Sequence, residues 1–416
     1  MNQIKQGYKQ TKVGIIPEDW KVVKLSEVLK EKPKYGIGAS AKEFSTKLPT
    51  YLRITDIDNG KFKPNKKASV SDKEYINYIL KENDLVFART GATVGKSYIY
   101  NPNDGELVYA GFLIKISPDI SKLNSVFFKN FVDSFYYWKW VQLMSMRSGQ
   151  PGINAEEYSS MTIPLPPLKE QEKIAEILTT WDEAISKQTE LLEAKELLKI
   201  ALMQKLLSGE VRFSGFSDEW EEVRLSKIIK LQGGYAFKSE EFKKKGIPII
   251  RISNISNNSN YMEMNDLIYY DELSNESNFL IKKNDLLIAM SGATTGKVSI
   301  YNLEKKAYLN QRVGLFKVIK PTLINYSFLI QFVFSNFFSV QLKSLLVAGA
   351  QPNISSKDIE SLKIKLPSLP EQQKIAEVLS LVDDEINLLK NELEELKLQK
   401  KALMQKLLTG EVRVKV

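Results

Sequence analysis

Residues 165–176 read LPPLKEQEKIAE, and almost the same sequence, LPSLPEQQKIAE, returns at residues 366–377. With the same offset of 201 residues, ALMQKLLSGEVR at 201–212 returns as ALMQKLLTGEVR at 402–413. No insertion or deletion separates the two copies between these motifs. The chain is therefore a tandem duplication that keeps one segment almost constant in both copies.

The constant segment predicts a long helix in each copy. Pro166, Pro167 and Pro370 mark its start, and Gly209 and Gly410 mark its end. Apolar residues recur at alternating steps of four and three, which is typical of a coiled-coil seam. Each helix should span roughly 40 residues, or about 60 Å. The predicted seam consists of Ile174, Leu178, Trp181, Ile185, Leu192, Leu202 and Leu206 in the first copy, and of Ile375, Leu379, Val382, Ile386, Leu389, Leu393, Leu396, Leu403 and Leu407 in the second.

Polar residues interrupt this seam at Gln188, Lys195 and Lys199 in the first copy and at Lys400 in the second. A seam of this kind needs a partner helix, and the nearest candidate is the other copy. The acidic pairs at 182–183 and 383–385 fall on the same helices, and we interpret them as a solvated face.

Two variable blocks, residues 1–164 and 214–365, precede the helical regions 165–213 and 366–416. Short strand-like runs at 51–57, 85–88, 249–252 and 285–289, separated by turn residues, predict a mixed α+β fold. The aromatic stretches 127–141 and 328–346 predict helices whose rings pack in a core. The two blocks share scattered short motifs and differ in the sequence between them. They should therefore have a common backbone framework with different side chains.

Composition narrows the chemistry that this chain can perform. Its 416 residues include neither cysteine nor histidine, which excludes a serine–histidine triad, thiol catalysis and histidine- or cysteine-ligated metals. The net charge of +9 indicates a polyanionic partner. It is unevenly spread: the two blocks carry +7 and +5, and the helical regions −2 and −1. The sequence predicts no membrane span or signal peptide, so we expect a cytoplasmic protein.

A Gly-rich run, TGATVGKS at 90–97, resembles a nucleotide-binding P-loop only superficially. Three residues rather than four separate Gly91 from Gly95, and in the second copy Lys297 is followed by valine. We interpret each run as a turn that brings backbone N–H groups and one lysine, Lys96 or Lys297, to phosphate. A plain hairpin turn is the alternative.

Other side chains are candidates for contact with DNA, because arginine can bind guanine and glutamine or asparagine can bind adenine. Some precede the long helices, and others follow the first strand-like segment of each block in a predicted loop. Arginines at or near the short motifs that the two blocks share complete the set. The full set of predicted DNA-binding residues is Lys34, Tyr35, Arg53, Arg89, Lys96, Arg147, Gln150, Tyr235, Lys238, Arg251, Lys297, Arg312, Gln351 and Asn353.

With its two divergent blocks, each followed by the LPxLxEQxKIAE and LMQKLLxGEVR motifs, the chain resembles the specificity subunit of type I restriction–modification enzymes over essentially its whole length. The resemblance implies two target recognition domains, each reading half of a split DNA site. It also implies that the conserved helices form an antiparallel coiled coil in a pseudo-twofold tandem repeat. This coiled coil would space the domains and bind two modification (methyltransferase) subunits, which restriction (endonuclease/translocase) subunits join.

In this interpretation the chain has no catalytic residues, no metal site and no cofactor, and S-adenosylmethionine, ATP and Mg²⁺ belong to the partner subunits. No methylation motif occurs in the sequence, which agrees. Two alternatives remain: a DNA-binding coiled-coil regulator without enzymatic partners, and a nucleotide-dependent enzyme using the Gly-rich runs. Antiparallel pairing further predicts that the N-terminal segment completes the second repeat, as residues 213–220 complete the first.

Overall fold

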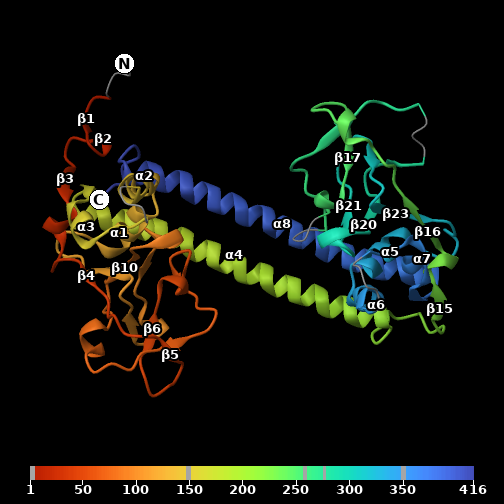
Figure 1. Cartoon of the computed structure of the whole chain (residues 1–416), viewed down its shortest axis with the longest axis horizontal. Coiled ribbons are helices and arrows are strands. Elements are labelled where there is room, and N and C mark those ends of the chain that lie inside the picture. Colours follow the sequence, from red (N-terminus) through yellow and green to blue (C-terminus); the bar gives the residue numbers. More distant parts are fainter. Residues whose placement is uncertain (1–4, 147–150, 256–259, 275–277, 348–352) are drawn as a thin grey trace. The chain divides into compact units, whose positions relative to one another are not determined.

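The computed structural model describes residues 5–146, 151–255, 260–274, 278–347 and 353–416. Contacts divide the chain into two compact units. Unit 1 contains Met1–Thr189 and Glu392–Val416, and unit 2 contains Glu190–Asn391. Each unit therefore combines one variable block with half of each long helix, as Figure 1 shows.

The two long helices have nearly the predicted bounds. Helix α4 spans Leu168–Ser208, directly after Pro166 and Pro167, and α8 spans Leu369–Leu408. Past their ends, Gly209 and Gly410 have φ angles of 79° and 69°. Glycine adopts this left-handed conformation without a steric cost, which explains why both copies end their helix with it.

Within unit 1 the two helices pair in antiparallel orientation. Lys400 Nζ of α8 lies 2.6 Å from Asp182 Oδ1 of α4, and further along α4 Gln188 Nε2 donates to Glu392 Oε2 at 2.9 Å. Increasing residue numbers on α4 therefore pair with decreasing residue numbers on α8. The polar interruptions of the seam are not defects, because each one has a partner on the other helix.

Unit 2 has the same antiparallel arrangement. Lys195 of α4 pairs with Glu385 of α8 at 2.7 Å, and Lys199 pairs with Asp383. The side chains of Lys199 and Asp383 are only 13% and 17% exposed. Our interpretation of the acidic pairs as a solvated face is therefore wrong for Asp383, whereas Asp182 and Glu385 stay 47% and 44% exposed while pairing with the other helix.

The apolar residues of the predicted seam are all buried or half-buried. Ile174, Leu178, Ile375 and Leu379 are almost completely inaccessible, because they also join the cores of the variable blocks. The helices thus pack on each other and on the blocks.

The variable block of unit 1 contains two four-stranded sheets packed against each other. Alternation along β10 explains this packing: Leu85 and Phe87 face one core cluster, and Val86 and Ala88 face the other. The first sheet has the order β11 (Ser97–Ile99), β10 (Leu85–Ala88), β13 (Leu113–Ile116) and β4 (Lys34–Tyr35). The second has the order β12 (Leu107–Tyr109), β6 (Thr50–Leu52), β9 (Ala68–Ser69) and β5 (Lys42–Glu43).

The variable block of unit 2 repeats this plan with the same alternation along its central strand, β20. The sheet order is β16 (Ile229–Gly233), β23 (Val313–Val318), β20 (Leu286–Ala289) and β21 (Val298–Ile300) in the first sheet. It is β18 (Ile268–Tyr270), β17 (Ile247–Ile250), β22 (Ala307–Leu309) and β19 (Leu280–Ile281) in the second.

Small two-stranded sheets complete both units. They are formed by β1 (Tyr8–Thr11) with β2 (Gly14–Pro17), β3 (Lys21–Lys24) with β14 (Thr162–Leu165), β7 (Ile57–Asp58) with β8 (Lys61–Phe62), and β15 (Glu221–Arg224) with β24 (Lys363–Leu366). The strand predicted at 51–57 is therefore interrupted, because a 3₁₀ turn at Ile54–Asp56 separates β6 from β7.

Each predicted aromatic helix is in fact a pair of helices. Unit 1 has α1 (Ser125–Val132) and α2 (Phe135–Ser145), and unit 2 has α5 (Tyr326–Val333) and α6 (Asn336–Val347). Ser134 Oγ accepts a hydrogen bond from the Tyr137 N–H and so caps the start of a second helix. The continuous periodicity of the sequence had predicted a single helix here. Short helices α3 (Ala155–Ser160) and α7 (Ser356–Ser361) follow. The aromatic residues of α1 and α5 pack in the cores, as expected. On α2 the expectation is partly wrong, because Phe135 and Trp138 are 65% and 41% exposed.

The repeated EQ dipeptide fastens each long helix to its block. Gln171 accepts a hydrogen bond from the Asn124 N–H and donates to the carbonyl of Lys122. Gln372 makes the same bonds with Asn325 and Leu323 in unit 2. Both glutamines are fully buried, so their amides need these partners.

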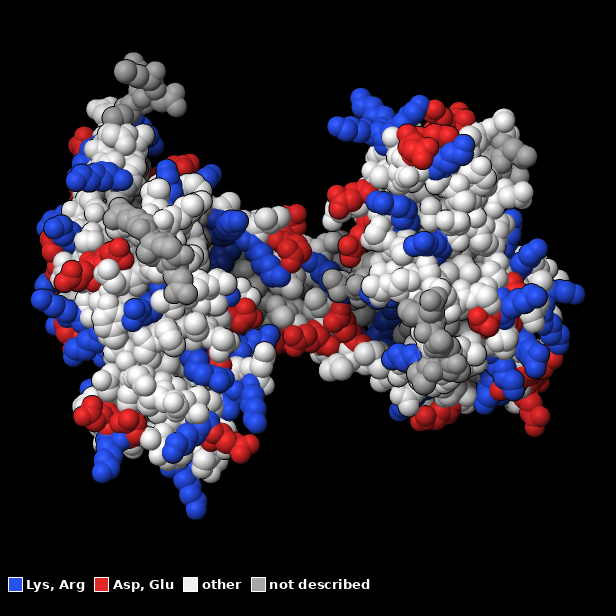
Figure 2. All heavy atoms as spheres, in the orientation of Figure 1, with Lys and Arg blue, Asp and Glu red and all other residues white. Residues whose placement is uncertain are grey.

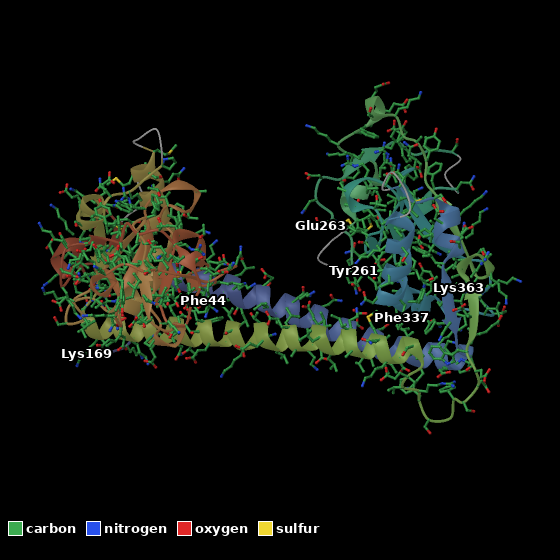
Figure 3. All side chains as sticks on the ribbon, turned by 60° about the horizontal axis from the view of Figure 1, so that its bottom comes forward. Phe44, Lys169, Tyr261, Glu263, Phe337 and Lys363 are labelled. Atoms are coloured by element: carbon green, nitrogen blue, oxygen red, sulfur yellow. The ribbon has the colours of Figure 1, made fainter. Side chains whose placement is uncertain are left out.

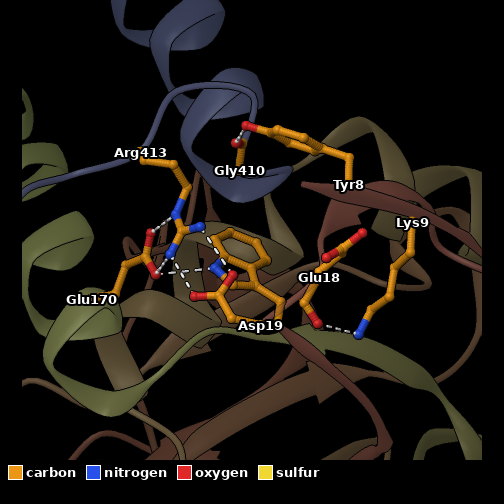
Figure 4. Close-up of polar contacts among 8 residues, drawn as sticks. Tyr8, Lys9, Glu18, Asp19, Glu170, Gly410 and Arg413 are labelled. Atoms are coloured by element: carbon orange, nitrogen blue, oxygen red, sulfur yellow. Dashed lines mark hydrogen bonds and ion pairs between the residues drawn. The ribbon is translucent and has the colours of Figure 1, made fainter. Parts of the chain in front are cut away.

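The preceding glutamate joins three distant segments. In unit 1, Glu170 accepts hydrogen bonds from Trp20 and Arg413, and Arg413 also pairs with Asp19 (Figure 4). The Tyr8 hydroxyl donates to the carbonyl of Gly410 at 2.7 Å (Figure 4). The N-terminal segment therefore completes the second repeat, which confirms our expectation. In unit 2, Glu371 binds Arg212 and Trp220 in the same way.

Within the described residues no single helix has the length and hydropathy needed to cross a membrane. One bent pair, Tyr326–Val333 with Asn336–Leu346, meets that criterion only when its two helices are taken together.

Candidate nucleic-acid interface

In unit 1, several predicted DNA-binding residues lie together at one end of the first sheet. Arg89 follows β10, and its guanidinium lies 4.7 Å from the centre of the Tyr35 ring, on β4. The Tyr35 hydroxyl accepts a hydrogen bond from the backbone of Ala155, at the start of α3. Tyr35, which we expected in a loop, is thus on a strand, and it is 42% exposed.

The Gly-rich turn of unit 1 borders the same place. The Gly91 N–H donates to the carbonyl of Pro151, and the Ile153 N–H donates to the carbonyl of Arg89. Strand β10, the turn and the segment before α3 are therefore held together by backbone hydrogen bonds. Three sequence-distant candidate regions form one surface, which we call rim 1: Tyr35, Arg89, Gly91, Phe112 and Pro151–Gly152.

Phe112 belongs to rim 1 although the sequence analysis did not select it. Its carbonyl accepts from the Arg89 N–H across β10 and β13, and its ring is 62% exposed. A large exposed ring beside an arginine that stacks on tyrosine is a suitable surface for nucleotide bases. Aligning the two copies in register would have drawn attention to it.

Unit 2 has the same backbone geometry with different side chains. Met290 occupies the position of Arg89, and its N–H donates to the carbonyl of Arg312 at 2.9 Å. The Ile354 N–H donates to the Met290 carbonyl, as Ile153 does to Arg89. At this pair of facing positions each unit has one arginine and one apolar residue. The arginine follows the central strand in unit 1 (Arg89, after β10), whereas in unit 2 it precedes the neighbouring strand (Arg312, before β23).

Tyr235 lies beside this pair. Its backbone bonds with Leu309 and Gln311 place it next to Arg312, and its ring, 47% exposed, lies 5.0 Å from that of Phe279. We call the corresponding surface rim 2: Tyr235, Met290, Gly292, Arg312 and Asn353. The Arg312 side chain is exposed and makes no ion pair with a described residue.

A close approach of two backbones fixes the base of each rim. A Cβ atom on Gly36 would lie 2.2 Å from the Ala110 carbonyl oxygen, and one on Gly234 would lie 2.1 Å from that of Leu309. Only glycine fits at these two positions. They also align the copies structurally, so that Tyr235 corresponds to Ile37 rather than to Tyr35.

Other candidates are engaged by acidic neighbours or lie outside the described residues. Lys34 pairs with Glu31, whose carboxyl pKa is lowered mainly by its hydrogen bond with Lys34. Lys238 is exposed and lies 3.6 Å from Glu241. Arg147, Gln150 and Gln351 fall outside the described residues.

Arg53 and Arg251 occupy equivalent positions after β6 and β17. Arg53 Nε and Nη2 bind both carboxylate oxygens of Asp56, which is only 2% exposed. This hydrogen-bonded partner raises the pKa of Arg53. In unit 2 an asparagine, Asn254, stands in place of the aspartate, and among the described residues its side-chain oxygen accepts from the Arg251 backbone N–H alone, at 3.1 Å.

The lysines of the Gly-rich turns differ in their surroundings. Lys96 is half-buried and forms no ion pair with a described residue. Lys297 lines a cavity of about 580 Å³ together with Lys199, Asp383, Glu196 and other residues of α4, α5, α6 and α8.

The visible face of each unit carries charged side chains of both signs. In Figure 2 lysine and arginine side chains are spread over the visible face of each unit, interspersed with acidic ones. Among the described residues, no group of three or more acidic side chains is placed to hold a metal ion. The N–H groups of Gly91, Gly95 and Lys96 donate to carbonyls within the chain, so our expectation that the turn presents them to phosphate is wrong for these three. The arginines and exposed rings of the rims remain suited to contacts with bases and phosphates.

Known proteins share both the sequence pattern and the fold. The sequence is 28% identical to the type I restriction enzyme MjaVIII specificity subunit of Methanocaldococcus jannaschii, over 96% of this chain and 94% of that one. It is 24% identical to the EcoKI specificity subunit of Escherichia coli K12, over 87% of this chain and 82% of the relative. The crystal structure of a type I S subunit from M. genitalium has the same fold, with a TM-score of 0.62 and 18% identity over 93% of this chain and 96% of that one.

The family described as type I restriction modification DNA specificity domain matches the sequence twice, over residues 17–196 and 217–398. These two segments correspond to the two copies of the duplication and cover most of the sequence. The chain therefore belongs to the family of type I restriction–modification DNA specificity domains, of which it contains two in tandem.

Proposed function

We propose that this chain is the DNA-recognition subunit of a type I restriction–modification complex, with residues 1–164 and 214–365 each reading one half of a bipartite target. The observation that supports this proposal most directly is the pair of rims. Arg89 with Phe112, and Met290 with Arg312, share one backbone hydrogen-bonding pattern but exchange the arginine between the two strands. A common scaffold with different exposed side chains is what two related half-site readers require.

The central tyrosines and arginines of the rims are the residues we assign to base contact. The Arg89 guanidinium lies over the Tyr35 ring, a contact that restricts its orientation. Arg312 is exposed and free of an acidic partner among the described residues. Asn353 precedes Ile354, whose N–H donates to the Met290 carbonyl, and we assign its amide to contact with adenine.

The long helices are proposed to set the spacing between half-sites and to bind two modification subunits. Leucines remain exposed on their outer faces in unit 2: Leu191 and Leu198 on α4, and Leu381 and Leu388 on α8. Each pair is separated by seven residues, so its members lie on one helix face. Exposed apolar residues grouped on one face favour a protein partner.

Catalysis would then reside on the partners. S-adenosylmethionine would act in the modification subunits, and ATP and Mg²⁺ in the restriction subunits. No observation favours the nucleotide-dependent alternative, because the turn at 90–97 lacks P-loop spacing. Equilibrium dialysis of the purified chain with ATP should detect no binding.

The test is the methylation pattern of the host genome with and without the gene for this chain. We expect one bipartite motif to lose methylation when the gene is deleted. Co-purification with a methyltransferase subunit should accompany it. Unchanged methylation together with no co-purifying methyltransferase would support a DNA-binding regulator instead.

A further inference from the structure

Arg53 and Arg251 occupy equivalent positions but differ in charge compensation. Both follow a strand of the second sheet, and both donate from Nη2 to a backbone carbonyl at 3.0 Å, that of Lys66 or Asp266. In unit 1 the remaining guanidinium contacts go to Asp56. In unit 2 no described carboxylate lies within ion-pair distance of Arg251.

One substitution, aspartate to asparagine, accounts for this difference. Asp56 Oδ2 accepts from both the backbone N–H and Nε of Arg53, each at 2.9 Å. Within the part of the chain that the structure describes, Asn254 Oδ1 accepts from the Arg251 backbone and not from its guanidinium. Its Nδ2 donates to the carbonyls of Glu263, labelled in Figure 3, and Asn265, at 3.3 and 3.2 Å.

The Arg251 Nε is left buried and without a hydrogen-bond partner among the described residues. The Ser291 hydroxyl, at the start of the Gly-rich turn of unit 2, is likewise buried and unpartnered there. A half-buried guanidinium without a counterion is costly unless an anion approaches it.

Arg251 is also adjacent to the Gly-rich turn. The Thr294 hydroxyl donates to the Ile252 carbonyl at 3.2 Å, and a Cβ on Gly292 would lie 3.1 Å from the Ile252 side chain. The residue after Arg251 therefore packs directly on this turn, which borders rim 2. An anion bound at Arg251 would lie beside the surface that we assign to DNA.

We propose that Arg251 binds a DNA phosphate in the second block, and that Arg53 does not do so in the first because Asp56 neutralises it. This inference rests on the proposed function. It predicts an electrostatic asymmetry between two half-site readers whose backbones match. Arg251 would position the DNA and would not select bases.

The test changes the partner and not the arginine. In Asn254→Asp, residue 251 should gain the ion pair that Arg53 has, so one phosphate contact should disappear. Binding of the full-length chain to double-stranded DNA is measured across a salt series. We expect the magnitude of the slope of log K against log salt to fall by about 0.9.

Two further variants make the outcome decisive. Arg251→Gln removes the charge directly and should lower the slope by a similar amount. It is needed because the aspartate in Asn254→Asp cannot keep the bonds of Asn254 Nδ2 to the two carbonyls. Asp56→Asn is the matched control in unit 1, where it removes a carboxylate from Arg53 and should not lower the slope. Thermal unfolding checks that all three variants fold.

The inference is overturned if Asn254→Asp and Arg251→Gln both keep the wild-type slope, or if Asp56→Asn lowers it equally. Failure of the proposed function is a separate result. It would appear in the unmodified chain, as DNA binding that does not weaken with salt or as a host methylation pattern that does not depend on the gene.

Discussion

Arg413, near the end of the sequence, binds the Glu170 carboxylate at the start of α4 through two hydrogen bonds of 2.7 and 2.9 Å. In unit 2, Arg212 binds Glu371 at the start of α8 through bonds of 2.8 and 2.7 Å. The arginine of the GEVR motif in each copy therefore binds the glutamate of the EQ motif in the other copy. This exchange explains why both motifs are kept nearly constant: the two form one joint.

Removing either arginine should destabilise the corresponding unit. Glu170 and Glu371 are only 2% and 1% exposed, so Arg413→Met or Arg212→Met leaves a buried carboxylate with only tryptophan as a side-chain partner. For Arg413→Met we expect a loss of roughly 2 kcal/mol of unfolding free energy, less than for a fully buried pair because Arg413 is partly exposed. Arg212→Met should lower the stability of unit 2 in the same direction. Urea denaturation measures it. Two variants as stable as the wild type would show that the joint is not structural.

Acid should weaken the joint of unit 1 through Asp19. The pKa of Asp19 is lowered from its ordinary value of 3.8, chiefly by its hydrogen bond with Arg413. Its contribution to stability is therefore fully present above pH 3.8 and is lost as the pH falls through the lowered folded-state pKa. The stability difference between wild type and Asp19→Asn should shrink below pH 3.8, and a difference that grows there would contradict this.

Two equivalent aspartates in the coiled coil should differ in importance. Asp182 pairs with Lys400 and is 47% exposed. Asp383 is 17% exposed and binds Lys199 of α4, Gln331 of α5 and the loop residue Asn260. Replacing Asp383 with alanine should therefore cost about 1–2 kcal/mol more than replacing Asp182. Equal losses in a denaturation experiment would argue against the polar network around Asp383.

The lysines of the Gly-rich turns should contribute affinity without sequence preference. We expect Lys96→Ala and Lys297→Ala each to weaken DNA binding and to reduce the magnitude of the salt slope by about 0.9, because each should meet one phosphate. Salt-dependent binding and determination of the methylated motif measure the two properties. A changed motif with an unaltered salt slope would assign these lysines to base reading.

If the helices act as a ruler, a heptad inserted at matched points of both should widen the spacer of the target. Seven residues add about 10 Å to each helix and preserve the seam. This length corresponds to about three base pairs at roughly 3.4 Å each. The methylated motif of an active variant is the readout, and an unchanged spacer with unchanged half-sites would disprove the ruler.

The parts of the fold that depend on local sequence were predictable. Helix ends followed from proline and glycine, and the seam followed from spacing. The break between α1 and α2 was missed because its cause is one capping bond from Ser134 in an otherwise helical pattern. Lys199 and Asp383 are 184 residues apart, so the sequence could not indicate that the acid is a seam partner.

The candidate site was predictable only as a set of residue types. Arg89 and Tyr35 were both selected, but their stacking depends on the pairing of β4, β10 and β13. Phe112 was missed because nothing in its own neighbourhood marks it. Arg53 was selected for its charge, and the buried Asp56 that neutralises it is recognisable only in the folded chain.

The most direct test of DNA recognition by two independent blocks is an exchange of residues 214–365 for the corresponding block of a relative with a different target. The methylated motif of the chimera is then read by sequencing the host genome. We predict that one half of the motif changes to that of the relative, while the other half stays as it was. A chimera that methylates the original motif, or one in which both halves change, would contradict the account.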